Sequence, residues 1–191
     1  MDDILEITMV VAETFDRLGV AYVVADSLAS SLHGIPRATQ DVDIVADLHL
    51  GDVARFVAAL RSSFYVDEDA VRTAVETRAS FNVVHLTSYF KADVFVAMDD
   101  VATRLEVERG QRIALGGTPA REIRVASAED VVARKLAWFS LGDEVSERQW
   151  DDALGVLRVA GATLDVGYLR HISALLGVEA LLDRALRAAG R

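Results

Sequence analysis

Two aspartates inside an apolar run constrain this chain more than any other feature. Asp41 and Asp43 lie in DVDIV, which otherwise has the alternation of a half-buried strand. Side chains two residues apart on a strand point to the same face, so both carboxylates project together while Val42 and Ile44 face the core. Neighbouring carboxylates repel each other unless a positive charge lies between them. A divalent cation with oxygen ligands, Mg²⁺ or Mn²⁺, is the simplest such charge.

A third acid occurs in a second β-rich run, FKADVFV, where Asp93 stands between Ala92 and Val94. If the strands 41–45 and 90–97 are neighbours, three carboxylates converge. Such a set can hold two metal ions about 3.5–4 Å apart, the spacing used for in-line displacement at phosphorus. Lys91, close to this acid, is expected on the opposite face of the strand, in solvent. The alternative is an acidic α/β domain whose carboxylates are merely solvated.

The segment before the paired aspartates, SLASSLHGIPRATQ, predicts an anion site. Ser27 is expected to cap a short helix, 28–33, that ends at Gly34. Free backbone N–H groups at a helix start bind anions, and Ser27 adds a hydroxyl. Arg37 is expected either to neutralise Asp41 or Asp43, or to contact phosphate.

Composition narrows the class of partner. The chain has 191 residues, 52% of them hydrophobic, a formal net charge of −10 and no cysteine. An acidic surface disfavours broad, non-specific binding to nucleic acid, although a local basic pocket stays compatible with it. The acidic start MDD and the lack of an apolar run of about 20 residues argue against a secretory signal and a membrane span. We therefore expect a cytoplasmic protein with no membrane partner.

Hydrophobic periodicity predicts an α/β (α+β) fold with a mixed sheet, flanking helices and a C-terminal helical bundle. A shift in composition after residue 126 predicts an α/β core, 1–126, and a C-terminal helical region, 127–191, packed on it. Strands are expected at 20–25 and 41–45, and in hairpins at 80–97 and 111–125, the second turning at Gly116 and Gly117. Helices are expected at 3–18, 50–63, 68–77, 127–141, 146–160, 165–176 and 178–189.

This pattern resembles the nucleotidyltransferase superfamily with the DNA polymerase β-like fold, and within it the AbiEii-like, minimal toxin-type branch of bacteria and archaea. The positions that match the family pattern are Ser27, Ala29, His33, Gly34, Arg37, Thr39, Asp41 and Asp43. FKADVFV resembles the strand that carries the family's third acid, here Asp93. ASAEDVVARKLAWF resembles a helix with a lysine near the nucleotide, here Lys135, and SERQWDDALGVL resembles the helix that follows.

The resemblance implies metal-dependent transfer of a nucleoside monophosphate from an NTP such as ATP to a hydroxyl, with Mg²⁺ or Mn²⁺ as cofactor. Asp41, Asp43 and Asp93 would be the catalytic and metal-binding residues, and Ser27, Arg37 and Lys135 would bind the nucleotide. The acceptor could be an RNA end such as that of a tRNA, a protein side chain or a small molecule. A toxin-antitoxin role would add an antitoxin partner, and a homo-oligomer is a further open alternative.

One departure from the family pattern concerns the phosphate site. The two glycines that precede the serine are replaced by Ala25 and Asp26. A side chain there crowds the phosphates, and a carboxylate about 4 Å from a phosphate costs ~4 kcal/mol at an effective dielectric near 20. The alternative function is therefore a degenerate, catalytically impaired nucleotidyltransferase fold that serves as a binding or regulatory partner.

Overall fold

The chain forms two compact units in the computed structural model, which describes residues 2–39, 41–115 and 120–191. The first unit comprises Met1–Val24 and Ala38–Val125, and the second comprises Ala25–Arg37 and Ala126–Arg191. Residues 25–37 and residue 126 group with the C-terminal helices, whereas the expected α/β core was 1–126. The reason is that the helix in this segment packs on two helices of the C-terminal region.

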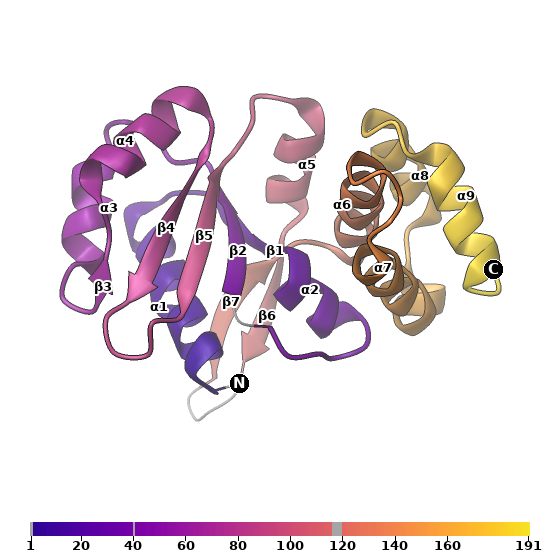
Figure 1. Ribbon diagram of the computed structural model, residues 1–191, viewed down its shortest axis with the longest axis horizontal. Coiled ribbons are helices and arrows are strands. Elements are labelled where there is room, and N and C mark those ends of the chain that lie inside the picture. The colour runs from indigo at the N-terminus through magenta and orange to yellow at the C-terminus, as the bar shows by residue number, and fades with distance from the viewer. Residues whose placement is uncertain (1, 40, 116–119) are drawn as a thin grey trace. The chain divides into compact units, whose positions relative to one another are not determined.

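The first unit contains a mixed sheet with helices (Figure 1). Its elements are α1 (Asp2–Leu18), β1 (Tyr22–Ala25), β2 (Asp41–Ala46), α3 (Val53–Leu60), β3 (Phe64–Tyr65), α4 (Glu68–Thr77), β4 (Ser80–His85), β5 (Lys91–Val96), α5 (Val101–Arg109), β6 (Gln111–Leu115) and β7 (Arg121–Val125). The strand order is β3-β4-β5-β2-β1-β7-β6. The pairs β2–β5 and β1–β7 are parallel, whereas β3–β4, β4–β5 and β6–β7 are antiparallel.

Aromatic side chains fix the packing between α1 and its neighbours. The ring of Phe15 lies 5.5 Å from that of Tyr22 and 5.0 Å from that of Phe56, and all three side chains are fully buried. Helix α1 thereby packs against the sheet and against α3, while α4 packs on β4. Helix α1 ends at Leu18 and is followed by Gly19, whose φ of +70° is the left-handed conformation that glycine adopts without cost.

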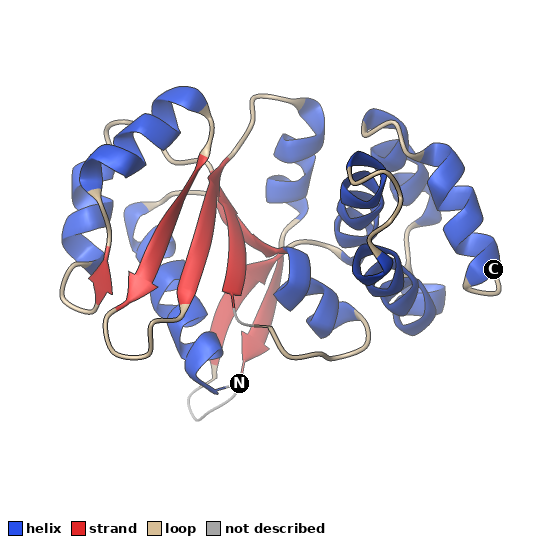
Figure 2. Ribbon diagram, in the orientation of Figure 1, coloured by secondary structure: helices blue, strands red, loops and turns tan. Residues whose placement is uncertain are grey.

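The second unit is helical (Figure 2). Its elements are α2 (Asp26–His33), α6 (Ala128–Leu141), α7 (Glu147–Ala160), the 3₁₀ turn η1 (Gly161–Thr163), α8 (Val166–Leu175) and α9 (Glu179–Ala188). Helix α2 packs on both α6 and α7. At the end of α2 a Cβ on Gly34 would lie 2.8 Å from the backbone nitrogen of Val156 in α7, which explains the glycine in the His-Gly turn.

Most predicted elements are present, with two qualifications. The strands of both hairpins pair antiparallel, but the turn predicted at Gly116 and Gly117 lies outside the described residues. The predicted N-cap role of Ser27 is wrong, because α2 begins at Asp26 and its N-cap is Ala25, with no side-chain hydrogen bond. Ser27 therefore lies within the first turn of the helix.

Of the described helices, none combines the length and the apolar character that crossing a lipid bilayer requires.

Candidate functional site

Strands β2 and β5 bring the three predicted carboxylates to adjacent positions in the sheet of the first unit. The register pairs Asp43 with Asp93 and Asp41 with Lys91. Burial alternates along both strands: Val42, Ile44, Ala92 and Val94 are fully buried, whereas the acids are half-buried. The strands 41–46 and 91–96 are therefore neighbours, as the hypothesis of a shared acidic site requires.

Lys91 belongs to this acidic group, and its expected position on the opposite face is wrong. Residues two apart on a strand share a face, so Lys91 and Asp93 project together. The Lys91 Nζ donates to Asp93 Oδ2 at 2.6 Å. That hydrogen bond raises the pKa of Lys91 above its ordinary value against the opposing effect of burial, and the charges of Asp93, Asp41 and Asp43 raise it further.

The donor chemistry of this group suits a hard divalent cation, because the three acids offer only carboxylate oxygens. The Thr39 hydroxyl also lies beside these acids, 2.9 Å from the backbone oxygen of Asp41 and 3.2 Å from Asp41 Oδ1. In the part of the chain that the structure describes, however, no three acidic or histidine side chains are gathered closely enough to hold a metal ion. The ammonium of Lys91 supplies a positive charge to the acids instead.

A second polar group lies in the second unit and is centred on Lys135 of α6. This side chain is 1% exposed, and its Nζ donates to Asp26 Oδ1 and, at 2.8 Å, to Asp152 Oδ2. A buried ammonium requires such carboxylate partners, since an unpaired buried charge is strongly destabilising. Asp26 starts α2 and Asp152 lies on α7, so Lys135 joins three helices of the unit.

Ser27 is the second centre of this group, and its hydroxyl is fully engaged. The buried Oγ accepts hydrogen bonds from Arg37 Nη2 at 2.6 Å and from Arg148 Nη2 at 2.9 Å, and it donates to Asp26 Oδ1 at 3.0 Å. One proton and two lone pairs are all that a serine hydroxyl offers. Two guanidinium groups therefore converge on one oxygen at the start of a helix, the setting in which anions bind.

Asp26, which stands where the family pattern has a glycine, has a left-handed backbone conformation. Its φ is +44°, in the left-handed region where a side chain is disfavoured. The Asp26 carboxylate accepts from Lys135 and Ser27, two of the three residues predicted to bind nucleotide. An anionic side chain of the protein thus engages the donors that a phosphate would need.

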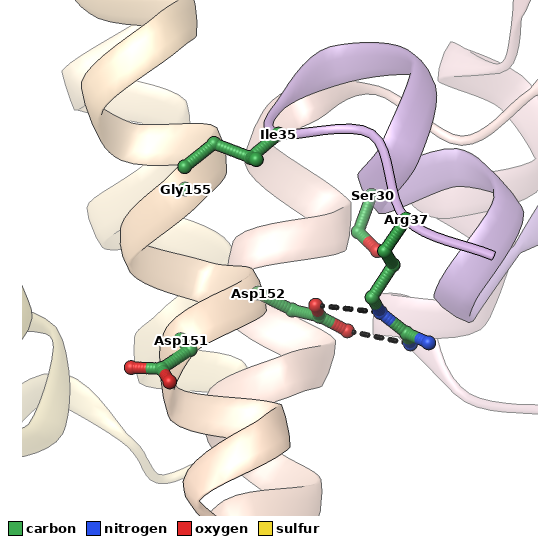
Figure 3. A pocket seen from close by; sticks show the side chains of 6 residues that line it. All are labelled: Ser30, Ile35, Arg37, Asp151, Asp152 and Gly155. Carbon is green, nitrogen blue, oxygen red and sulfur yellow. Dashed lines mark hydrogen bonds and ion pairs between the residues drawn. The ribbon is translucent and has the colours of Figure 1, made fainter.

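Arg37 pairs with Asp152 in a fork-shaped contact, visible in Figure 3. Its Nε lies 3.0 Å from Asp152 Oδ1 and its Nη2 lies 3.0 Å from Asp152 Oδ2. Burial alone would raise the pKa of Asp152, but hydrogen bonds from Arg37 and Lys135 and the charges of both residues hold this pKa below its ordinary value. Asp152 therefore supplies a negative charge that binds both Arg37 and Lys135.

A small cavity of about 180 Å³ opens beside this pair. It is lined by Ser30, Ile35, Arg37, Asp151, Asp152 and Gly155. Figure 3 shows that Asp152 points toward Arg37, whereas the neighbouring Asp151 points away from it.

Sequence reasoning placed Ser27, Arg37 and Lys135 at the nucleotide but assigned no role to Asp152 or Arg148. The structure brings all five residues into the Ser27–Lys135 group. The signal was available in SERQWDDALGVL, where two adjacent aspartates and an arginine precede a run rich in apolar residues. Spacing alone does not say which of Asp151 and Asp152 faces inward.

Comparison with solved structures identifies the fold. The chain is similar to an antigenic nucleotidyltransferase-like protein from Paracoccidioides brasiliensis, with a TM-score of 0.57, 16% identity, and coverage of 98% of this chain and 93% of that one. It is also similar to the antibiotic-resistance factor ANT(2″)-Ia in solution, with a TM-score of 0.52, 15% identity and coverage of 96% and 97%. The crystal structure of ANT(2″)-Ia in complex with adenylyl-2″-tobramycin gives a TM-score of 0.52, 15% identity and coverage of 93% and 98%.

Comparison with protein-family models finds no match, and comparison with curated proteins finds none either. At the identities of the solved structures the likeness concerns the fold, which is that of nucleotidyltransferase-like proteins.

Proposed function

We propose that the chain transfers a nucleoside monophosphate from a nucleoside triphosphate to a hydroxyl of an acceptor and releases pyrophosphate. The observation that carries this proposal is the register of β2 and β5, which pairs Asp43 with Asp93 and keeps Asp41 on the same face. The fold shared with nucleotidyltransferase-like proteins supports it. Among the solved structures, ANT(2″)-Ia was crystallised with an adenylylated acceptor, adenylyl-2″-tobramycin.

In this reaction the acceptor oxygen attacks the α-phosphorus, and the bond from this phosphorus to the bridging oxygen of the β-phosphate breaks. Asp41, Asp43 and Asp93 would hold a divalent cation through their carboxylate oxygens, and Asp93 would also accept the proton of the acceptor hydroxyl. Bound Mg²⁺ or Mn²⁺ would lower the pKa of that hydroxyl and stabilise the charge of the leaving pyrophosphate. For Asp93 to take these roles it must release Lys91, with which it is paired.

The second unit contains side chains that suit phosphate. Ser27, Arg37 and Lys135 offer a hydroxyl, a guanidinium and an ammonium, which are typical phosphate donors. They stand at the start of α2, where backbone N–H groups add to the attraction for an anion. Asp26 opposes this attraction, so its carboxylate must move away from Lys135 when phosphate binds.

The motif resemblance to the AbiEii-like group favours a toxin-type enzyme of the cytoplasm that an antitoxin partner holds in check. An RNA end such as that of a tRNA, a protein hydroxyl and a small molecule remain the three acceptor classes of the proposal. The net charge of −10 favours an acceptor contacted over a small area rather than a long nucleic-acid surface.

The test is incubation of the chain with each of the four α-³²P-labelled NTPs, with Mg²⁺ or Mn²⁺, in the presence of total RNA and cell lysate. We expect label in one acceptor class, with loss of at least a hundredfold in rate for Asp43→Asn. Arg72→Gln, which removes an exposed charge from α4 of the same unit, serves as the control. Label transfer that persists in Asp43→Asn would refute the assignment of the carboxylates.

A second candidate function is favoured by the contacts of Asp26. Because this carboxylate binds Lys135 and Ser27, the chain could be an impaired nucleotidyltransferase fold that acts as a binding or regulatory partner. Absence of labelled product with every NTP, combined with nucleotide binding only after Asp26→Gly, would favour this candidate. Turnover by the native chain would exclude it.

A further inference from the structure

We infer that Arg148 is a phosphate-binding residue of the nucleotide site, an assignment that rests on the proposed function. Arg148 lies in the first turn of α7 and is exposed. Its Nη2 donates to Ser27 Oγ at 2.9 Å, beside the Nη2 of Arg37 at 2.6 Å from the same oxygen. Ser27 is 1% exposed, so one side of this contact is fixed within the protein.

The charges of the group single out Arg148. Lys135 is bound by the carboxylates of Asp26 and Asp152, and Arg37 is paired with Asp152. Over the described ranges 2–39, 41–115 and 120–191, Arg148 makes no ion pair with a carboxylate, and its partner is the neutral hydroxyl of Ser27. Three cationic side chains thus face two carboxylates, and the surplus positive charge resides on Arg148.

The guanidinium groups of Arg37 and Arg148 share one hydroxyl, and Arg37 alone of the two is paired with a carboxylate among the described residues. A phosphate oxygen can accept hydrogen bonds from both guanidinium groups at once. It would then take the place of the neutral serine hydroxyl as a charged, stronger acceptor. Arg148 is also the member of the group with the greatest freedom to reach a ligand, because it is exposed and holds a single side-chain hydrogen bond among the described residues. Its charge therefore favours ligands with several phosphates over a nucleoside or a monophosphate.

The test uses inorganic tripolyphosphate as a probe without a base, titrated by calorimetry into the native chain and into Asp26→Gly. We expect Arg148→Gln to weaken binding roughly ten- to a hundredfold in each background that binds, the loss typical of one charged hydrogen-bonding partner. Arg148→Lys keeps the positive charge but not the two-pronged guanidinium, so its affinity for tripolyphosphate should lie between that of its parent and that of Arg148→Gln. Arg158→Gln removes the same charge from the same helix, where the side chain donates to Ala188 O, and should change the affinity less than twofold.

Thermal unfolding without ligand shows that the variants are folded. Equal affinity of Arg148→Gln and its parent would overturn the inference, and so would an equal loss in Arg158→Gln, which would indicate a long-range charge effect. Failure of tripolyphosphate to bind both the native chain and Asp26→Gly would also overturn the inference. The proposed function is read separately: a chain that transfers label from an NTP but binds tripolyphosphate equally well without Arg148 keeps the function and loses the inference.

Discussion

Replacement of Asp26 by glycine should free an anion site that the Asp26 carboxylate itself occupies in the native chain. The Asp26 carboxylate accepts hydrogen bonds from Lys135 and Ser27, two donors assigned to the phosphates. Its backbone, with a φ of +44°, already has a conformation that glycine adopts without strain. The substitution therefore removes a charge and a side chain while leaving the path of the chain unchanged.

The gain in affinity follows from the removed repulsion. A carboxylate and a phosphate oxygen about 4 Å apart repel by ~4 kcal/mol at an effective dielectric near 20. The side chain of Asp26 is 21% exposed, and screening by water at that exposure leaves about half of this energy. The remaining ~2 kcal/mol corresponds to a fall of roughly thirtyfold in the dissociation constant for an NTP.

The stability of the ligand-free protein should change in the opposite direction. Lys135 loses one of its two carboxylate partners but keeps Asp152. Loss of a partner from a buried ion pair costs about 3–5 kcal/mol when no other remains, and relief of the left-handed backbone returns about 1 kcal/mol. We expect the free energy of unfolding to fall by about 2 kcal/mol, which lowers the Tm by roughly 4–8 °C for a chain of this size.

Isothermal titration with each NTP and Mg²⁺ measures the affinity, and differential scanning calorimetry measures the Tm. Asp26→Asn removes the charge but keeps a side chain, so it separates repulsion from crowding. Asp143→Gly makes the same substitution at an exposed residue with a φ of +54° and should leave nucleotide affinity unchanged. An Asp26→Gly protein that binds every NTP no more tightly than the native chain would refute the reasoning.

Three further changes test other parts of the account. Lys91→Met removes the cation from the acidic group and should tighten Mn²⁺ binding, measured by calorimetry, about tenfold. The control Arg72→Met removes the same charge elsewhere and should not change Mn²⁺ binding. Unchanged or weaker Mn²⁺ binding by Lys91→Met would contradict this prediction. The depressed pKa of Asp152 stabilises the fold above the ordinary Asp pKa of about 3.9, and this stabilisation is lost as the pH falls through the folded-state pKa. Asp152→Asn should therefore lower the free energy of unfolding, measured by urea titration, by roughly 2–3 kcal/mol at pH 7. This difference from the native chain should shrink toward pH 3. A difference that does not depend on pH would argue against the ion pairs. Gly34→Ala places a methyl group 2.8 Å from the backbone of α7 and should lower the free energy of unfolding, measured thermally, by about 1–3 kcal/mol. Gly51→Ala, where a Cβ would meet no atom within 4 Å, should have almost no effect. Equal effects of the two substitutions would refute the close approach at Gly34.

The sheet and the acidic strands were predictable because they depend on local pattern. The alternation in DVDIV and KADVFV fixes which side chains are buried, and two strands with the same alternation can pair with their acids aligned. Because side chains two residues apart on a strand share a face, Lys91 lies beside Asp93, and the expectation that it faces the opposite side is wrong.

The phosphate group in the second unit was only partly predictable. Motif resemblance indicated Ser27, Arg37 and Lys135, but not that Asp26 binds Lys135, because these residues are 109 positions apart and the contact depends on how α2 packs on α6. The conformation of Asp26 was likewise hidden, since a positive φ at a non-glycine residue follows from the surrounding structure rather than from local preference.

The grouping of residues 25–37 with the C-terminal helices has the same origin. The sequence places the start of α2 next to a strand, and nothing in its composition separates it from the sheet. Its small residues, Ala29 and Ser30, are buried, and its last turn fits against α7 only because Gly34 has no side chain. Tertiary packing, rather than propensity, decides the unit to which this helix belongs.

The proposed function requires Asp41, Asp43 and Asp93 to come together around a divalent cation when nucleotide binds, because among the described residues no three acidic side chains are gathered closely enough to hold one. Anomalous diffraction from a crystal soaked with Mn²⁺ and a non-hydrolysable NTP tests this requirement directly. We predict a peak within about 2.0–2.6 Å of carboxylate oxygens of these three residues, with the ammonium of Lys91 displaced from Asp93. Ordered nucleotide in the crystal with no peak at these carboxylates would contradict the claim.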